Sequence, residues 1–378
     1  MPEAASPPAR SAAEIRFTQV GSGARIAWAR NGRGPVLVRV AHWMTHVEHD
    51  LRSPVWRPWL ERLGRGLEVV RYDERGCGLS GSDDVPLGLE AATEELAAVV
   101  AAVVATTAAT RLGTSVVNTS APRVALLGQS GAAAPAIAYA VQHPERVSHL
   151  VLLGGYLAGL LHLQPSAEAL AFHEASLRLV ELGWGRNDPA VQQFFTTRFI
   201  PDASLDEARA LNEQQRLSCG PARAAQIMQA RTALDVRALA PQVQCPTLVL
   251  HAEGDQIVPV ARGRDLAAAI PHARFVTLPT RNHIPLASDA GFELFCRSVT
   301  EFVRPDVRAD GSAPALTPRE RELAALVAQG LDNLQIAAHL GVADKTVRNA
   351  LSTLYAKLQV EGRPQAVVRA RELGLGGN

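Results

Sequence analysis

Short runs of apolar and β-branched residues alternate with longer helix-forming stretches in the first part of this chain. The runs predicted to be strands are 25–30, 35–41, 67–73, 123–128 and 147–155. Strands that alternate with helices and are apolar along most of their length are typical of a mostly parallel sheet covered on both faces. The sequence therefore predicts an α/β fold for this region.

The alternation stops between residues 157 and 240 and then resumes. Helix-forming sequence fills that interval, including 167–183 and 205–218, before strands are again expected at 247–255 and 273–279. Ligands of open α/β sheets bind beyond the carboxyl ends of the strands. We expect the helical insertion at about 157–240 to form a lid over that edge.

The length of the chain and its composition shifts predict more than one domain. Residues 1–14 are expected to be a flexible N-terminal tail. The segment 304–315 combines Pro, Gly, Asp and Ser with few apolar residues, which is typical of a linker. The expected organisation is an α/β domain over 15–303, then this linker, then a small all-α domain over 316–378.

The composition of the chain restricts its cellular compartment and its binding partners. The formal net charge is only +1, so nucleic-acid binding would have to come from a local basic face. Four scattered cysteines without a CxxC pair argue against a zinc ribbon or disulfide scaffold and favour a reducing cytoplasm. The N-terminal residues lack the apolar core of a secretory signal, and the Ala-rich run 96–110 is too short to span a bilayer. We expect a cytoplasmic protein with no membrane partner.

A candidate nucleophile follows the strand that ends near residue 128. The sequence Gly-Gln-Ser-Gly-Ala places Ser130 on a sharp turn between this strand and a helix of small residues. Such a turn needs small neighbours two positions either side, which Gly128 and Ala132 supply, although Gly is commoner where Ala132 stands. The backbone N–H of Gly131 would then face a developing oxyanion.

Two further residues complete a possible catalytic triad. Asp255 ends a later strand, and His283 follows the next one, so the chain order is Ser, Asp, His, as in α/β-hydrolases. In this arrangement Ser130 attacks, His283 accepts its proton, and Asp255 fixes the imidazole tautomer and stabilises its cation.

These motifs resemble the α/β-hydrolase superfamily over residues 15–303. The stretches AHWMTHVEHD and RYDERGCGLSGS, within 41–82, are similar to a subgroup often attached to regulatory modules. The resemblance implies a second oxyanion N–H at Trp43, in the loop after the third strand. It also implies that Asp73, Arg75 and Gly76 brace the floor of the active site rather than take part in chemistry.

Several side chains near this loop invite a second interpretation. His42, Trp43 and Trp184 are candidates for lining a ligand pocket, although aromatic residues in such segments are as readily core packing. His42, His46 and His49 have a spacing that could bind a metal. The simpler interpretation is an active-site loop with incidental imidazoles, so no metal and no cofactor are expected.

The last 60 or so residues predict a helix-turn-helix. Thr317 can cap a first helix that ends at Gly330, and a second helix starts at Asn333 and stops at Gly341. Asp344 can cap a third helix, which follows after a tight turn. Two helices joined by such a turn form the arrangement that places its second helix in the DNA major groove.

The third helix has one apolar face and one polar face. Apolar residues at helical spacing would pack inside, which leaves six residues for DNA: Lys345, Thr346, Arg348, Asn349, Ser352 and Lys357. A small solvated bundle or a dimerisation module would show the same pattern. Basic residues only slightly outnumber acidic ones in this segment, so charge alone does not decide.

The segment resembles the LuxR-type helix-turn-helix. It shares the L-T-x-R-E opening, the N-x-x-I-A-x-x-L core and the K-T-V-R-N start of the recognition helix. One departure is Ala350, where His is frequent, which puts one family phosphate contact in doubt. The resemblance implies double-stranded DNA as partner, inverted-repeat sites, and a homodimer supported by the helix at 363–374.

Two functional hypotheses follow from these motifs. In the first, the protein is a DNA-binding transcription regulator whose hydrolase-fold domain binds a small-molecule effector and either hydrolyses it or only holds it. In the second, it is an active serine esterase or lactonase with an accessory helical domain. The complete helix-turn-helix favours the first hypothesis, and the Ser-Asp-His set keeps catalysis within it.

Overall fold

The computed structural model describes most of the chain. The described residues are 14–82, 87–111, 122–184, 186, 189–304, 316–358, 360, 362–372 and 375. The chain divides into two compact units, Met1–Arg304 and Pro305–Asn378. Nearly all of the predicted tail at 1–14 and of the predicted linker at 304–315 lies outside the described residues, so both stay predictions.

Eight strands within the described residues form one sheet, in the order β1-β2-β4-β3-β5-β6-β7-β8. They are β1 (Ile15–Gln19), β2 (Arg25–Gly32), β3 (Val36–Arg39), β4 (Glu68–Tyr72), β5 (Val124–Gln129), β6 (Val147–Leu153), β7 (Thr247–Ala252) and β8 (Arg274–Leu278). β2 pairs antiparallel with β1 and β4, and all other neighbours are parallel. The α/β prediction is confirmed. The prediction did not include β1. This edge strand is partly exposed, so its sequence has only a weak apolar pattern.

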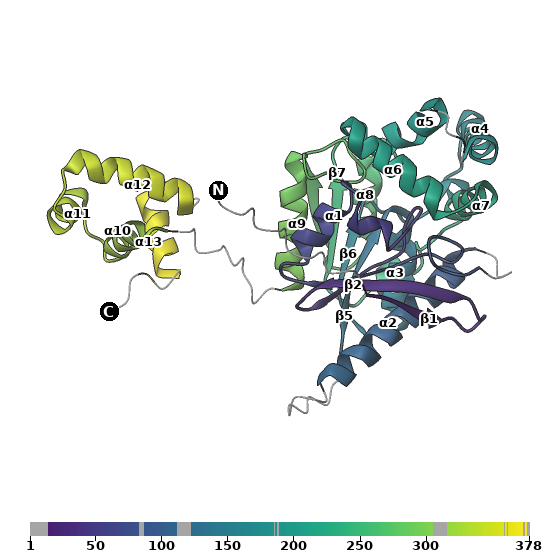
Figure 1. Cartoon of the computed structure of the whole chain (residues 1–378), viewed down its shortest axis with the longest axis horizontal. Helices are drawn as coiled ribbons and strands as arrows, with labels where there is room; N and C mark the ends of the chain where they lie inside the picture. The colour runs from purple at the N-terminus through teal and green to yellow at the C-terminus, as the bar shows by residue number, and fades with distance from the viewer. Residues whose placement is uncertain are drawn as a thin grey trace, which may run out of the picture. The chain divides into compact units, whose positions relative to one another are not determined.

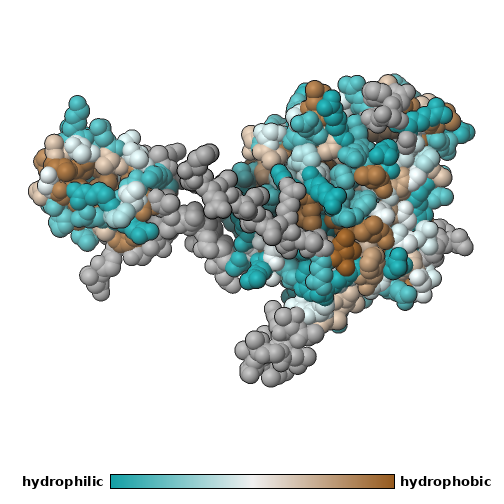
Figure 2. Space-filling model, viewed as in Figure 1, coloured by the Kyte–Doolittle hydropathy of each residue, from teal (hydrophilic) through white to brown (hydrophobic). Residues whose placement is uncertain are grey.

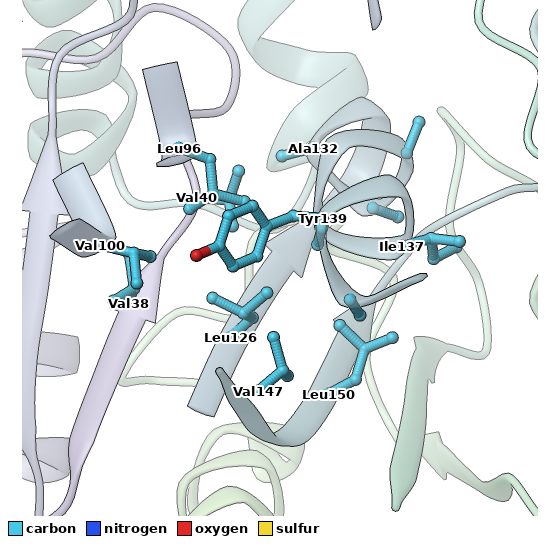
Figure 3. Packing of buried hydrophobic residues seen from close by; sticks show 14 of the residues in the cluster. Val38, Val40, Leu96, Val100, Leu126, Ala132, Ile137, Tyr139, Val147 and Leu150 are labelled. Atoms are coloured by element: carbon cyan, nitrogen blue, oxygen red, sulfur yellow. The ribbon is translucent and has the colours of Figure 1, made fainter. Parts of the chain in front are cut away.

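Side chains that alternate along the strands divide the core between the two faces of the sheet. Leu126 packs toward α2 (Leu89–Arg111) and α3 (Ala133–Gln142), whereas its neighbour Leu127 packs toward the opposite layer. Figure 3 shows the first layer, in which residues of β3, β5 and β6 meet those of α2 and α3. The layer on the other face is built by α1 (Arg57–Leu63) and α9 (Ala290–Val303).

Helices fill the chain between β6 and β7, within the interval predicted to be a lid. They are α4 (Ala167–Gly183), α5 (Pro189–Phe199), α6 (Leu205–Ser218) and α7 (Pro221–Thr232), followed after β7 by α8 (Val260–Ala269). Local capping explains two of the starts, because Ser166 and Ser204 accept hydrogen bonds from the backbone three residues on. Figure 1 shows α4–α7 gathered at one side of this unit.

The C-terminal unit is all helical where it is described. It contains α10 (Pro318–Ala328), α11 (Asn333–Leu340), α12 (Asp344–Leu358) and α13 (Arg363–Glu372) around one apolar core. Thr317 and Asp332 form capping boxes, and Gly341 ends α11 with a left-handed φ of 66°. Asp344, predicted to cap the third helix, is instead its first helical residue, where its charge also favours the helix N-terminus.

A helix that crosses a bilayer must be both long and apolar. Among the helices in the described ranges, none combines the length and the apolar character that crossing a membrane demands.

Candidate active site and DNA-binding face

Ser130 lies on a tight turn directly after β5. Its φ is 54°, a left-handed conformation that non-glycine residues rarely adopt. Gly128 is required by the same turn, because a Cβ there would lie 2.8 Å from the carbonyl oxygen of Ala132. Ala132 itself is fully buried in the core, so its methyl group is accommodated. Ser130 therefore lies on a sharp turn after β5, as expected from the sequence, and its backbone there is strained.

Asp255 and His283 are in direct contact. His283 Nδ1 lies 2.6 Å from Asp255 Oδ2, and both side chains are buried. The other carboxylate oxygen, Oδ1, accepts hydrogen bonds from the backbone N–H groups of Ile257 at 2.8 Å and Val258 at 2.9 Å. Burial opposes ionisation, but the charge and hydrogen bond of His283 outweigh it and lower the pKa of Asp255. An ionised Asp255 can thus orient the imidazole.

The contact with Asp255 leaves the second imidazole nitrogen free for chemistry. Among the described residues, His283 Nε2 is buried and has no hydrogen-bond partner. Gly154 lies against the ring, because a Cβ there would be 2.9 Å from His283 Cε1. With Nδ1 protonated toward Asp255, the lone pair of Nε2 can accept a proton from a nucleophile.

The loop after β3 carries Trp43 and is held by the lid helix α6. Met44, the next residue, has a φ of 51°, so the loop is locally strained. Its carbonyl oxygen accepts hydrogen bonds from Ser218 Oγ at 3.0 Å and Gln214 Nε2 at 3.4 Å. Trp43 Nε1 donates to Gln215 Oε1 at 3.2 Å. The backbone that was predicted to supply an oxyanion N–H is therefore fixed by the lid.

Ser130, Gly131 and Trp43 line one cavity of about 650 Å³ between the sheet and the lid. This volume is in the range of small-molecule sites. Much of the remaining wall is apolar and includes Leu160, Leu163, Phe172, Phe195, Phe199 and Met228. Of the three residues predicted to line a ligand pocket, Trp43 does so, whereas His42 and Trp184 are outside the lining.

His42 is buried beneath the loop, where Arg39 contacts its Nε2 and Trp56 packs against its ring with centroids 4.8 Å apart. Burial, followed by the charge of Arg39, lowers the pKa of His42 well below its usual value, so it is neutral. His46 and His49 lie with ring centroids 6.2 Å apart. Within the described residues, no group of three potential ligands is placed to hold a metal ion.

The segment predicted to brace the active-site floor does so through buried hydrogen bonds. Asp73 accepts from the backbone N–H of Val47 at 2.8 Å and of Leu79 at 2.9 Å, which ties the turn to the loop after β3. The Arg75 side chain is fully buried and pairs with Glu95 at 3.0 Å. These residues support the fold and do not line the cavity.

The polar face of α12 is exposed as predicted. Exposed side chains include those of Lys345, Thr346, Arg348, Asn349, Ser352 and Lys357. Two of them form ion pairs: Arg348 with Asp344 at 2.8 Å, and Lys357 with Glu320 at 2.7 Å. Exposed pairs of this kind are weak, so a phosphate can compete for both cations. Figure 2 shows hydrophilic residues interspersed with a few hydrophobic ones on the visible face of α10–α13.

Comparison with family sequence profiles agrees with both parts of this description. The profile described as "Serine aminopeptidase, S33" matches residues 60–286, more than half of the chain. The profile described as "Bacterial regulatory proteins, luxR family" matches residues 314–370. The chain belongs to the α/β-hydrolase superfamily. Its C-terminal unit is a LuxR-type helix-turn-helix domain.

The individual relatives include both transcription regulators and hydrolases. The probable HTH-type transcriptional regulator GfsR of Streptomyces halstedii is 39% identical over 116 residues, which are 28% of this chain and about half (47%) of that regulator. The putative carbamate hydrolase RutD of Klebsiella pneumoniae is 26% identical over 241 residues, 62% of this chain and 81% of that protein. A hydrolase from Pseudomonas aeruginosa PA01 superposes with a TM-score of 0.60 at 21% identity, over 79% of this chain and 100% of its own. This last likeness concerns the fold alone.

The α/β-hydrolase domain also contains cavity residues that the sequence did not reveal. Arg231 at the end of α7 donates to both oxygens of Glu74, at 2.9 and 3.0 Å. Burial opposes its charge, but Glu74 and other nearby ionisable groups together outweigh burial and raise the pKa of Arg231. Arg198 and Arg262 line the same cavity. Only Glu74 lay within a motif, the D-E-R-G turn, and nothing in the sequence linked it to a residue 157 positions away.

Proposed function

We propose that this protein is a transcription regulator that binds a small-molecule effector in its α/β-hydrolase domain and hydrolyses it. The observation that carries the proposal is the presence, in one chain, of a LuxR-type domain and of a cavity lined by a strained serine. A DNA-binding domain alone needs no such cavity, and a free hydrolase needs no recognition helix. The union of the two favours regulation by a ligand.

Hydrolysis would use three side chains. Ser130 attacks a carbonyl carbon while His283 Nε2 accepts its proton, and Asp255 stabilises the resulting imidazolium. The backbone N–H groups of Trp43 and Gly131 stabilise the oxyanion. The leaving group takes the proton from His283, and water then releases the acyl group by the reverse sequence. The ester, lactone or amide bond of the effector is thereby cleaved. Cleavage returns the regulator to its effector-free state.

The LuxR-type domain would bind double-stranded DNA through α12. Lys345, Thr346, Arg348 and Asn349 lie at its exposed start, where a recognition helix reads base edges, while Ser352 and Lys357 lie farther along it. We further propose a cytoplasmic homodimer that recognises inverted repeats, since two identical domains match a site with two-fold symmetry. The domain limits proposed are 15–303 and 316–378, joined by 304–315.

The first experiment compares the wild type with Ser130→Ala on short-chain nitrophenyl esters and lactones. We expect Ser130-dependent turnover, lost in the variant, with binding of a non-hydrolysed analogue retained in calorimetry. If the two proteins behave alike in every assay, Ser130 has no catalytic role. If turnover is absent but binding occurs, the site is a receptor without hydrolysis.

The second experiment tests the DNA interface. Arg348→Ala should weaken binding to a selected operator by about 1–3 kcal/mol at fixed salt if Arg348 contacts a base or a phosphate. Arg321→Ala, at an exposed position of α10, serves as the control. Equal affinity of Arg348→Ala and wild type would contradict the assignment.

A second candidate function is an esterase or lactonase whose helical domain is only an accessory. The similarity to a putative carbamate hydrolase over 62% of the chain favours it. This candidate predicts turnover without sequence-selective DNA binding. Selection of binding sites from a random DNA pool, with and without the C-terminal domain, decides between the two.

A further inference from the structure

Three arginines contribute to the wall of the Ser130 cavity in the described part of the chain. They are Arg198 from the end of α5, Arg231 from the end of α7 and Arg262 from the start of α8. Glu168 is the one carboxylate in that lining, and its side chain is exposed. A cavity built to bind a neutral molecule gains nothing from burying cations, since removing a charge from water is costly.

One of these arginines is already neutralised by the protein. Arg231 forms a two-oxygen contact with Glu74, and the side chains of both are largely buried. It also lies next to the nucleophile, because a Cβ on Gly131 would be 2.8 Å from Arg231 Cδ. Its role in the cavity is therefore to form a rigid wall beside Ser130 rather than to offer a free charge.

The other two arginines have no carboxylate partner among the described residues. Arg198 lies over the ring of Phe172, with its guanidinium carbon 5.0 Å from the ring centroid. Burial lowers the pKa of Arg198, with no opposite charge to counter it. Arg262 is half-buried at the cavity wall, near enough to Tyr156 for its charge to lower the pKa of that hydroxyl against the larger effect of burial. Both guanidinium groups thus remain available to a ligand.

Guanidinium groups bind carboxylates through paired, charge-assisted hydrogen bonds, which are stronger where water is excluded. The apolar wall of Phe172, Phe195 and Phe199 surrounds the same space. We propose that the cavity takes an amphipathic carboxylate, with an apolar body, a carbonyl at Ser130 and a carboxylate bound by Arg198 and Arg262. This inference rests on the proposed function, because it assumes that the cavity is the effector site.

The test uses pairs of ligands that differ only in charge. Mono-nitrophenyl esters of glutaric and adipic acid are compared with the same compounds whose free carboxyl is capped as a methyl ester. The readout is the ratio of kcat/KM for the charged and the capped ester. The amide analogues of each pair are titrated into Ser130→Ala by calorimetry, which measures binding without turnover.

We expect the wild type to prefer the charged member of each pair. Arg198→Gln and Arg262→Gln should each reduce that preference on the order of tenfold, since each removes a charged hydrogen-bond donor. Arg262→Lys should retain part of it because the charge remains. Arg264→Gln, an exposed arginine on the same helix α8, should leave the preference unchanged. Thermal unfolding of each variant shows that the protein is folded.

The outcomes separate the two proposals. Binding or turnover of both members of a pair with equal efficiency, unchanged in Arg198→Gln and Arg262→Gln, would overturn the carboxylate inference and leave the effector site in place. Failure of every charged and capped compound, in turnover and in calorimetry, would overturn the inference and also the proposal that this cavity is the effector site.

Discussion

Two buried aspartates in the α/β-hydrolase domain each accept two backbone hydrogen bonds but have opposite pKa shifts. Asp73, in the floor beneath the loop after β3, accepts from the N–H groups of Val47 and Leu79. Asp255, in the candidate active site, accepts from those of Ile257 and Val258 at nearly the same distances. Yet the pKa of Asp73 is raised to about 7, whereas that of Asp255 is lowered.

The difference lies in the charges around each carboxyl group. Burial dominates at Asp73, and the nearby carboxylate of Asp50 adds to it, so that the two backbone hydrogen bonds and Arg71 only limit the rise in pKa. At Asp255 burial acts in the same direction, but the charge and hydrogen bond of His283 reverse the result. Backbone N–H groups can place a buried carboxyl group, but at Asp255 the added charge interaction and side-chain hydrogen bond of His283 are what lower the pKa.

The largest expected effect is on turnover when each carboxylate is made neutral. Asp255→Asn should lower kcat on the order of 10⁴-fold, because the amide favours the wrong tautomer of His283. Asp73→Asn should leave kcat of the folded protein within an order of magnitude, since Asp73 touches no reacting group. Nitrophenyl ester kinetics provide the measurement. A comparable loss in both variants would mean that the floor takes part in the chemistry.

The next effect concerns the glycines that lie against the two aspartates. Gly154→Ala would place a Cβ 2.9 Å from His283 Cε1, and Gly78→Ala a Cβ 2.2 Å from Asp73 Oδ2. Both have a left-handed φ, so each substitution should cost about 1–2 kcal/mol from backbone strain, and more from contact. Only Gly154→Ala should also lower kcat, on the order of 10²-fold, by displacing the imidazole.

Urea unfolding and ester kinetics on both glycine variants test this separation. Gly88→Ala is the matched control, because a Cβ at Gly88 meets nothing within 4 Å. A loss of kcat in Gly78→Ala as large as that in Gly154→Ala would remove the distinction between floor and site.

A third effect concerns the pH dependence of stability. In the unfolded chain Asp73 titrates near pH 4, so between about pH 4 and 7 the folded protein retains a proton that the unfolded chain releases. The stabilisation from this group is complete below about pH 4 and is lost as the pH rises through 7. Asp255 acts in the opposite sense, and its contribution is lost only as the pH falls below about 4.

Asp73→Asn removes this titration. The free energy of unfolding of the wild type should therefore fall relative to that of Asp73→Asn between about pH 5 and 7, by at most about 1.4 kcal/mol per pH unit. Urea unfolding across this range measures the two slopes, with Asp265→Asn, an exposed residue of α8, as control. Parallel slopes for wild type and Asp73→Asn would show that Asp73 is ionised throughout.

Features set by short stretches of sequence could be predicted, and those set by packing could not. The turn at Ser130 follows from small residues two positions away, and the capping of α10 from Thr317 and Glu320, so both could be predicted locally. The order of Ser130, Asp255 and His283 came from a family pattern. The proximity of Arg231 to Glu74, and to Gly131 beside Ser130, depends on how α7 packs on the sheet, which no periodicity encodes. The sequence therefore predicted that the lid is helical, but not which residues its helices contact.

The hold of α6 on the loop after β3 fixes a residue that belongs both to the cavity wall and to the proposed oxyanion site. Ser218, Gln214 and Gln215 contact the segment that supplies the Trp43 backbone to the oxyanion site. Trp43 also lines the cavity, so a ligand that contacts Trp43 contacts the segment that α6 holds. One loop would thus both contact the ligand and supply an N–H group to the oxyanion.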